Sequence, residues 1–334
     1  MFEQHFGLRR TPFVREIPVE VLYRSQAHKE ALARLRYVAE HRMFMALTGE
    51  SGVGKSTTLR ALKHELDPAR FEVIYLGLTN PSTVGFFEAL LAALHVEIPY
   101  RPSRARRLAS EVLLERFRNQ RRTPVLLVDE VQGFSMPLLE AIRGLMNYDC
   151  DSFSPFALVL AGSEEFRLRL PMRGLQALAG RLQMRFHLTG LKPEETVRYV
   201  EHQLQAAGAT GEIFTRPALQ RLHEVSTGIP RHINHLATLA LMAAAGVGTR
   251  LVDEELVRAL IETEWQGGRH EKAIHLGAVA PAHPRVTITT RGISIRAGEQ
   301  KLTLVRVDHV DEFMGRFAEA WAGWEKADDD DDDS

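Results

Sequence analysis

The strongest chemical signal is a glycine-rich octapeptide, Gly49-Glu50-Ser51-Gly52-Val53-Gly54-Lys55-Ser56, which fits the pattern G-x-x-x-x-G-K-[ST]. Glycines at these spacings let successive backbone N–H groups turn inward around phosphate oxygens. Lys55 is expected to reach the β- and γ-phosphates and the Ser56 hydroxyl to bind Mg²⁺, with Thr57 continuing the phosphate-binding segment. The octapeptide therefore predicts a site for ATP and Mg²⁺.

Two adjacent carboxylates form the second signal, because they follow the apolar run Pro124 to Val128. Asp129 is placed to hold Mg²⁺, through water, and Glu130 to orient and activate the water that attacks the γ-phosphate. An apolar run ending in Asp-Glu is by itself weak evidence for a nucleotide-hydrolysis motif. Downstream of a phosphate-binding loop it is strong, since both motifs must lie at neighbouring strand ends. Together they predict hydrolysis of ATP to ADP and phosphate.

Three weaker candidates would complete such a site. Ser163 follows an apolar run and could contact the γ-phosphate or the water, although a plain loop serine fits as well. Arg181 could neutralise charge in the site of a neighbouring subunit, with Arg173 and Arg185 as rivals. Arg231 follows a Gly-Ile-Pro turn and could sense the γ-phosphate; its other interpretation is a surface arginine near a helix start.

Alternating elements are needed to position these residues. Apolar periodicity predicts helices over 25–42, 55–65, 81–94 and 105–120, and strands over 43–47, 71–78, 124–128, 156–161 and 184–188. Strands that alternate with helices favour a parallel sheet covered on both faces. The fold class is therefore α/β, with the phosphate-binding loop after the first strand.

The strand pattern stops after Leu191. Helices are predicted over 192–207, 216–226, 229–245 and 253–265, followed by two strands over 285–295 and 300–307 and a helix over 311–326. The expected domains are an ATPase core over 1–190 that includes the N-terminal helix, an all-helical lid over 191–265, a linker over 266–284, a small hairpin-plus-helix module over 285–326, and a disordered acidic tail over 327–334.

Composition sets outer limits. The chain has 334 residues, a formal net charge of -1 and a single cysteine, so any nucleic-acid binding must come from a local patch and no intramolecular disulfide can form. Neither a signal peptide nor an apolar run of membrane-spanning length is evident. We therefore expect a cytoplasmic protein that makes no contact with a membrane.

Ordered short matches resemble one family, the AAA+ ATPases of the ExeA-like group. They include Phe6-Gly7-Leu8, Pro12-Phe13, Leu22-Tyr23, the segments 28–32 and 181–188, and the segment 191–196. The resemblance covers residues 1 to 265. It implies that Phe13 and Tyr23 lie near the adenine, that Ser163 is sensor 1, that Arg181 is the arginine finger and that Arg231 is sensor 2. Ser163 departs from the family pattern, in which a larger amide side chain is expected.

The ExeA-like group contains secretion-pathway ATPases and transposon target-selection ATPases of the TniB, TnsC and MuB type. Secretion members continue into a membrane helix and a cell-wall-binding domain, which this sequence lacks, so the leading hypothesis is transposition. The resemblance then implies a homo-oligomer, a ring or helical filament, that binds double-stranded DNA with ATP and recruits a transposase or another recombination protein. The alternative is an ATPase switch for a secretion, pilus or other protein assembly, without DNA.

A local arginine excess supports the DNA hypothesis. Between Arg101 and Arg122 there are eight arginines and two glutamates, a local charge of +6. We expect Arg101, Arg104, Arg106 and Arg107 to track a phosphate backbone, with sequence-independent binding because no element is typical of a base reader. A solvated arginine-rich helix face is the alternative.

Overall fold

The chain forms two compact units in a computed structural model that describes residues 2–14, 16–149, 152–265, 285–289, 292–297 and 300–303. One unit, the α/β unit, is Ile17–Leu191; the other, the helical unit, joins Met1–Glu16 to Lys192–Ser334. The domain prediction, which places residues 1–190 in one ATPase core, is wrong at its N-terminal end. The N-terminal segment instead packs with the helical unit, where His5 Nε2 donates to Thr249 O at 2.8 Å and Arg9 N to Ala207 O at 2.8 Å.

The α/β unit is built on a five-stranded parallel sheet in the order β2-β3-β4-β1-β5. The strands are β1 (Phe44–Gly49), β2 (Phe71–Gly77), β3 (Thr123–Asp129), β4 (Ala157–Gly162) and β5 (Met184–Leu188). All five predicted strands are present, each within two residues of its expected ends. Because the strands are parallel, their carboxyl ends lie along one edge, where ligand sites of such sheets occur.

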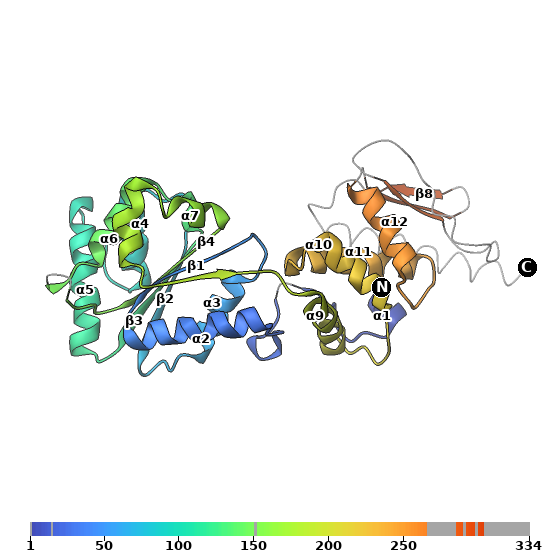
Figure 1. Ribbon diagram of the computed structural model, residues 1–334, viewed down its shortest axis with the longest axis horizontal. Helices are drawn as coiled ribbons and strands as arrows, with labels where there is room; N and C mark the ends of the chain where they lie inside the picture. Colours follow the sequence, from blue (N-terminus) through green and yellow to red (C-terminus); the bar gives the residue numbers. More distant parts are fainter. Residues whose placement is uncertain are drawn as a thin grey trace, which may run out of the picture. The chain divides into compact units, whose positions relative to one another are not determined.

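Helices cover both faces of this sheet (Figure 1). One face packs on α2 (Gln26–His41) and α3 (Lys55–Glu65); the other packs on α4 (Thr83–Ala93), α5 (Ala105–Asn119), α6 (Met136–Leu145), α7 (Glu164–Arg169) and α8 (Gln176–Arg181). Alternate residues of β1 enter the two cores, Met45 on the α2 side and Phe44 on the α4 side. Burial on both faces explains why the strands are continuously apolar.

Serine caps fix where several helices begin. The hydroxyl of Ser25 accepts the His28 N–H at 3.3 Å, that of Ser82 accepts the Gly85 N–H at 3.0 Å, and that of Ser135 accepts from the first turn of α6. The helices α6, α7 and α8 were not predicted from sequence. Two of them, α7 and α8, span only six residues each, which is too few turns for a clear period.

The helical unit contains α9 (Pro193–Ala206), α10 (Arg216–Ser226), α11 (Pro230–Gly246), α12 (Glu254–Trp265) and the short α1 (Phe2–Phe6). The four lid helices match the predicted ones to within a residue at each end. Among the described residues, no helix has the length and apolar character needed to cross a bilayer.

The C-terminal strands form an antiparallel sheet in the order β6-β7-β8, with β6 (Arg285–Thr289), β7 (Gly292–Ala297) and β8 (Gln300–Thr303). The single strand predicted over 285–295 is therefore wrong: it is two strands, with Thr289 paired to Gly292. Val286 and Ile288 alternate in one phase and Ile293 and Ile295 in the other, and this shift of phase is the sequence signal that separates the two strands. The predicted linker, the helix over 311–326 and the acidic tail lie outside the described residues.

Candidate nucleotide-binding site

The glycine-rich loop joins β1 to α3 at the carboxyl edge of the sheet, as predicted. Gly54 has φ +110°, and a Cβ there would lie 2.4 Å from Nε2 of His28. A Cβ on Gly49 would lie 2.5 Å from the carbonyl oxygen of Leu188. Both positions therefore require glycine, one for its backbone conformation and both for close approach. The loop therefore packs closely against His28 and Leu188, and a side chain at Gly54 or Gly49 would occupy the space that this packing leaves. We call the loop and this space the phosphate cradle.

Lys55 opens α3, and its ammonium is folded back into the loop. Nζ donates to Gly49 O at 2.9 Å and to Glu50 O at 3.0 Å. The side chain is buried, so its charge is held in a low-dielectric pocket beside loop N–H groups and a helix amino terminus. A phosphate in the cradle would meet a cation, N–H donors and a helix dipole, so the residues fit a bound nucleotide phosphate.

The predicted magnesium ligands lie together. The Ser56 hydroxyl donates to Oδ2 of Asp129 at 2.7 Å, and Asp129 is 1% exposed. Oδ1 of the same carboxylate accepts the Glu130 N–H at 2.9 Å, which fixes its orientation. A hydroxyl beside a carboxylate is the hard-oxygen donor set that Mg²⁺ prefers, so the pair fits this ion.

Tyr75 is a site residue that sequence reasoning missed. Its hydroxyl donates to Asp129 Oδ2 at 3.2 Å, from the neighbouring strand β2, and its ring lies over Gly77. The register pairs Gly77 with Asp129, so the absence of a side chain at Gly77 leaves room for the ring. The sequence does show Tyr75 two residues before Gly77 at the end of a predicted strand. That spacing indicates a contact with Asp129 only when the pairing of β2 with β3 is known.

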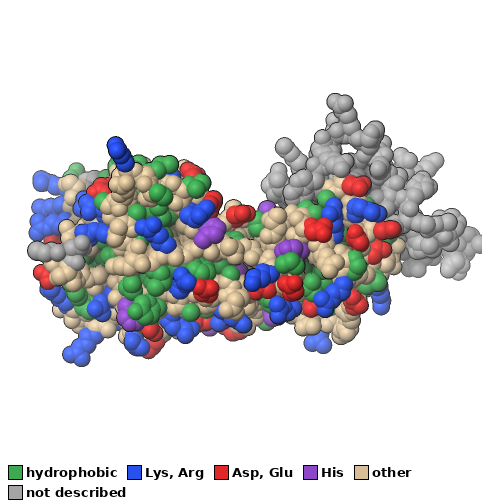
Figure 2. Space-filling view, viewed as in Figure 1, with side chains coloured by type: hydrophobic (Ala, Val, Ile, Leu, Met, Phe, Trp, Pro, Cys, Tyr) green, Lys and Arg blue, Asp and Glu red, His purple; other side chains and the backbone are tan. Residues whose placement is uncertain are grey.

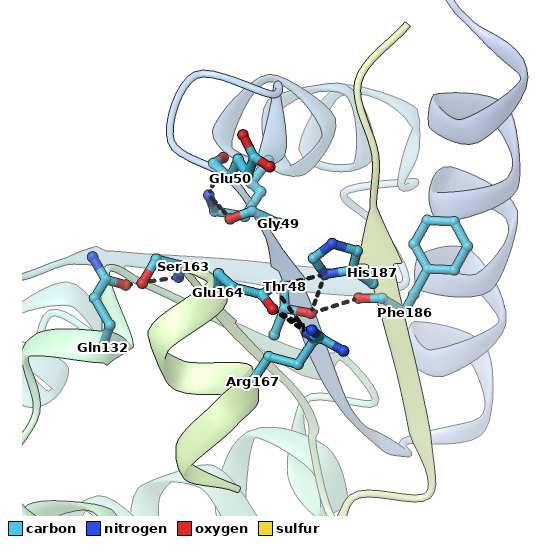
Figure 3. Close-up of polar contacts among 10 residues, drawn as sticks. Thr48, Gly49, Glu50, Gln132, Ser163, Glu164, Arg167, Phe186 and His187 are labelled. Atoms are coloured by element: carbon cyan, nitrogen blue, oxygen red, sulfur yellow. Dashed lines mark hydrogen bonds and ion pairs between the residues drawn. The ribbon is translucent and has the colours of Figure 1, made fainter. Parts of the chain in front are cut away.

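Glu130 lies just beyond β3 in the left-handed backbone region, with φ 60° and ψ 32°, and is exposed. One carboxylate oxygen, Oε2, accepts a hydrogen bond from Nε2 of Gln132. Oε1 of Gln132 accepts the backbone N–H of Ser163 at 3.0 Å (Figure 3). The ends of β3 and β4 are therefore joined through Gln132, a residue that the sequence had not singled out.

Ser163 lies at the end of β4, as expected, and precedes α7. A charged cluster follows it. Glu164 is paired with Arg167 and lies 3.6 Å from Nδ1 of His187, which is 3.1 Å from Oγ1 of Thr48 (Figure 3). The hydrogen bond from Arg167 lowers the pKa of Glu164, so the carboxyl is ionised at neutral pH. Thr48 precedes Gly49, so this cluster borders the phosphate cradle.

The arginine-finger candidates lie close in sequence but differ in exposure. Arg181, at the end of α8, is half-buried and donates to Met146 O at 3.2 Å. Arg185 is exposed on β5 and donates to Ala179 O at 2.5 Å. Arg173 is exposed in the 3-10 turn Arg173–Leu175. The finger assignment to Arg181 stays a prediction.

The residues implied for adenine and lid contacts are divided between the units. Phe13 and Arg231 belong to the helical unit and Tyr23 to the α/β unit. Phe13 is buried with φ 61°, Tyr23 is half-buried, and Arg231 is the exposed second residue of α11. Their roles toward a nucleotide stay predictions.

Most of the arginine excess is exposed. Arg116 and Arg122 instead donate to backbone carbonyls, of Leu94 at 2.9 Å and of Phe71 at 3.3 Å. The other six form what we call the α5 patch: Arg101, Arg104, Arg106, Arg107, Arg118 and Arg121. Figure 2 shows Lys and Arg side chains gathered over this end of the α/β unit. Within the patch, Arg107 pairs with Glu111 at 2.7 Å.

Comparison with protein families gives a match to the AAA domain over residues 38–170. This range holds β1, the phosphate-binding loop, β3 with its two carboxylates, and Ser163. These residues therefore form an AAA domain of the P-loop NTPase type, as the resemblance implied.

General secretion pathway protein A of Aeromonas hydrophila is a relative that is 36% identical over 283 residues. The match covers 80% of this chain and 51% of that protein, so the chain spans about half the length of this relative.

Solved structures share the fold at low identity. Cdc6p from Pyrobaculum aerophilum matches with a TM-score of 0.57 and 16% identity, over 72% of this chain and 67% of that one. The Drosophila ORC bound to DNA matches with a TM-score of 0.55 and 16% identity, over 78% and 65%. These likenesses confirm the α/β core followed by a helical lid.

Proposed function

We propose that this chain, whose residues 38–170 are an AAA domain with a nucleotide-binding P-loop, is an ATP-hydrolysing switch for a protein assembly of the secretion type. The observation that supports hydrolysis is the contact of the Ser56 hydroxyl with Asp129 at 2.7 Å, with Glu130 adjoining. It brings the phosphate cradle, a magnesium ligand set and a general base to one sheet edge.

The chemistry follows from these residues. Lys55 would exchange its two backbone acceptors for the β- and γ-phosphates, and Ser56 and Asp129 would hold Mg²⁺, which would neutralise phosphate charge. Glu130 takes a proton from water as the water oxygen bonds to the γ-phosphorus. The bond from that phosphorus to the bridging oxygen breaks, and ADP leaves with the oxygen. Loss of the γ-phosphate contacts then returns the switch to its ADP state.

The partner class rests on the secretion relative. At 36% identity over 283 residues, similarity extends well beyond the P-loop motifs and includes both units of this chain. The sequence alone favoured transposition, on the expectation that a secretion member would continue into further segments. The chain spans about half of the relative, so segments outside that half cannot decide between the two functions. We therefore prefer the alternative, a switch for a protein assembly. In this proposal, subunits pair so that an arginine from one completes the ATP site of the next.

The test is the size of the Glu130→Gln protein with ATP and Mg²⁺ against no nucleotide, together with its hydrolysis rate. A general base contributes about 10²- to 10⁴-fold, so this variant should bind ATP and hydrolyse it slowly. Larger assemblies that form only with ATP would support a switch. Hydrolysis at the wild-type rate would remove Glu130 as the base, and a mass independent of nucleotide would contradict the switch.

A second candidate function, ATP-dependent binding of double-stranded DNA, is favoured by the α5 patch. Its six exposed arginines lie on one helix and its flanking turns. Phosphate contacts of this kind give affinity without sequence preference and weaken steeply with salt. Duplex DNA added to the same sedimentation experiment separates the candidates. Co-sedimentation with DNA that requires ATP would favour the DNA-binding function. Assemblies that form with ATP but do not bind DNA would favour the switch for a protein assembly.

A further inference from the structure

We propose that Gln132 is a positioning residue for the general base Glu130. Gln132 holds the carboxylate of Glu130 at a fixed place relative to the end of β4. The inference rests on the proposed hydrolysis of ATP and deepens it. Gln132 lies two residues after Glu130, in the 3-10 turn η3 (Val131–Gly133). Its amide contacts both the base and the backbone of Ser163.

The orientation of the Gln132 amide is determined by its partners. Its Oε1 accepts the Ser163 N–H at 3.0 Å. A backbone N–H can only donate, so the opposite flip would set two donors against each other. The NH₂ group must therefore face Glu130, where it donates to Oε2. This leaves Oε1 of Glu130 to accept a proton from water.

The main chain of Gln132 is also held by the segment that follows β4. The guanidinium of Arg169, in α7, donates through one nitrogen to Gln132 O at 2.6 Å and through another to Phe134 O at 2.9 Å. Val131 and Phe134, on either side, are 0% and 1% exposed and anchor the turn in the core. Both the side chain and the backbone of Gln132 are thus tied to β4 and α7.

Glu130 needs such a support because its own surroundings do not confine it. Its side chain is exposed, and its backbone is in the left-handed region at the very end of β3. A general base must lie within hydrogen-bond reach of the water it deprotonates, and a displacement of about 1 Å can cost about 10²-fold in rate. Gln132 fixes the position of the Glu130 carboxylate and connects it to the backbone of Ser163, a residue predicted to contact the γ-phosphate.

The decisive variant is Gln132→Glu, which keeps the length of the side chain and an oxygen that can accept from Ser163. It replaces the donor to Glu130 by a second negative oxygen and so repels the base. We expect the single-turnover hydrolysis rate to fall about 10- to 100-fold, with the Kd for ATP within about twofold of wild type. Gln132→Ala should give a similar loss by leaving Glu130 without this donor.

Coupling to Glu130 is tested by the double variant. If Gln132 acts through the base, Gln132→Ala in a Glu130→Gln background should cause no further loss, because residues that act as a unit are not additive. Gln120→Ala is the matched control. This exposed glutamine accepts from Arg116 at the opposite edge of the sheet and should leave rate and affinity unchanged.

Two results would overturn the inference while leaving ATPase function intact: a wild-type rate in Gln132→Glu, or a full additional loss in the double variant. A large fall in ATP affinity in both Gln132 variants would also overturn it, since it would show a general role in the fold of the site. Failure of the wild-type protein to hydrolyse ATP would instead contradict the proposed function itself.

Discussion

The hydroxyl of Ser56 donates to Oδ2 of Asp129 at 2.7 Å, although the two residues are 73 positions apart in the chain. The contact joins the first turn of α3 to the carboxyl end of β3. β4 lies between β3 and β1 in the sheet, so the expectation that the two motifs end neighbouring strands is wrong, although both lie at the same edge. The contact places the two oxygens that would hold Mg²⁺ together, so little rearrangement of these two groups would be needed to bind the ion.

Lys55→Ala should weaken ATP binding. Each charge-assisted hydrogen bond contributes about 1.5–3 kcal/mol, so the Kd should rise at least about tenfold. Titration calorimetry with ATP and Mg²⁺ measures this. Lys63→Ala, an exposed lysine on the same helix, is the control and should bind as the wild type does. Equal affinities for the two variants would show that Lys55 does not contact phosphate.

Gly54→Ala should disturb the phosphate cradle. The new Cβ would meet His28 at 2.4 Å, and φ +110° is strained for any residue with a side chain. Strain of this kind costs about 1–3 kcal/mol. The control is Gly180→Ala in α8, where a Cβ has nothing within 4 Å. It should be neutral or stabilise by up to about 1 kcal/mol. The comparison requires thermal unfolding midpoints and ATP affinities for both variants. Two unchanged midpoints would contradict the strain at Gly54.

Glu65 should stabilise the α/β unit only above acidic pH. Burial alone would raise its pKa, but hydrogen bonds from Arg36 and Arg24 outweigh burial and lower the pKa from its ordinary 4.5. A carboxyl with a folded pKa below its unfolded one stabilises fully above the unfolded value, and the contribution is lost as pH falls through the folded value. The pairs are partly exposed, so the contribution is about 1 kcal/mol or less.

Glu65→Gln should therefore lower the unfolding midpoint at about pH 7 and have a smaller effect at about pH 3, where the wild-type carboxyl is protonated. Thermal unfolding followed at both pH values gives the answer. Glu115→Gln, on the exposed face of α5, is a suitable control. An equal loss at both pH values would assign the effect of Glu65→Gln to packing.

Charge reversal at Arg104, Arg106 and Arg107 should leave ATP affinity unchanged. If the α5 patch binds duplex DNA, the triple variant should also bind DNA more weakly, and the slope of log K against log salt should flatten by up to about 3. Fluorescence anisotropy across a salt series measures both quantities. A wild-type protein with no salt-dependent DNA binding would exclude DNA and leave the patch as a solvated helix face.

Much of the fold could be predicted from sequence because the relevant signals are local. The buried strands are short apolar runs, and the octapeptide must follow a strand and precede a helix. Lys55 and Asp129 both follow such apolar runs, so in a parallel sheet they are expected at the same edge. The parts that could not be predicted depend on contacts between distant segments. Tyr75 reaches Asp129 only through the strand pairing, and Gln132 gains its importance from the backbone of Ser163.

The N-terminal boundary and the functional class were harder for a different reason. Residues 1–16 form one compact unit with helices near residues 207 and 249, and no local pattern in the first 16 residues indicates this. The sequence-based preference for a DNA target over a protein assembly relied on segments expected after the ATPase region in secretion members, and not on residues of this chain. Overall similarity to the secretion relative is the stronger argument, because it uses residues that are present.

The internal hydrogen bonds of Lys55 have a consequence for turnover. Nζ donates to the carbonyl oxygens of Gly49 and Glu50, so a phosphate that takes up this ammonium must compete with two backbone acceptors. The net contribution of Lys55 to nucleotide affinity is then the difference between its phosphate contacts and these two hydrogen bonds. The same competition would ease the departure of a nucleotide, because each acceptor can take back a donor as the phosphate withdraws.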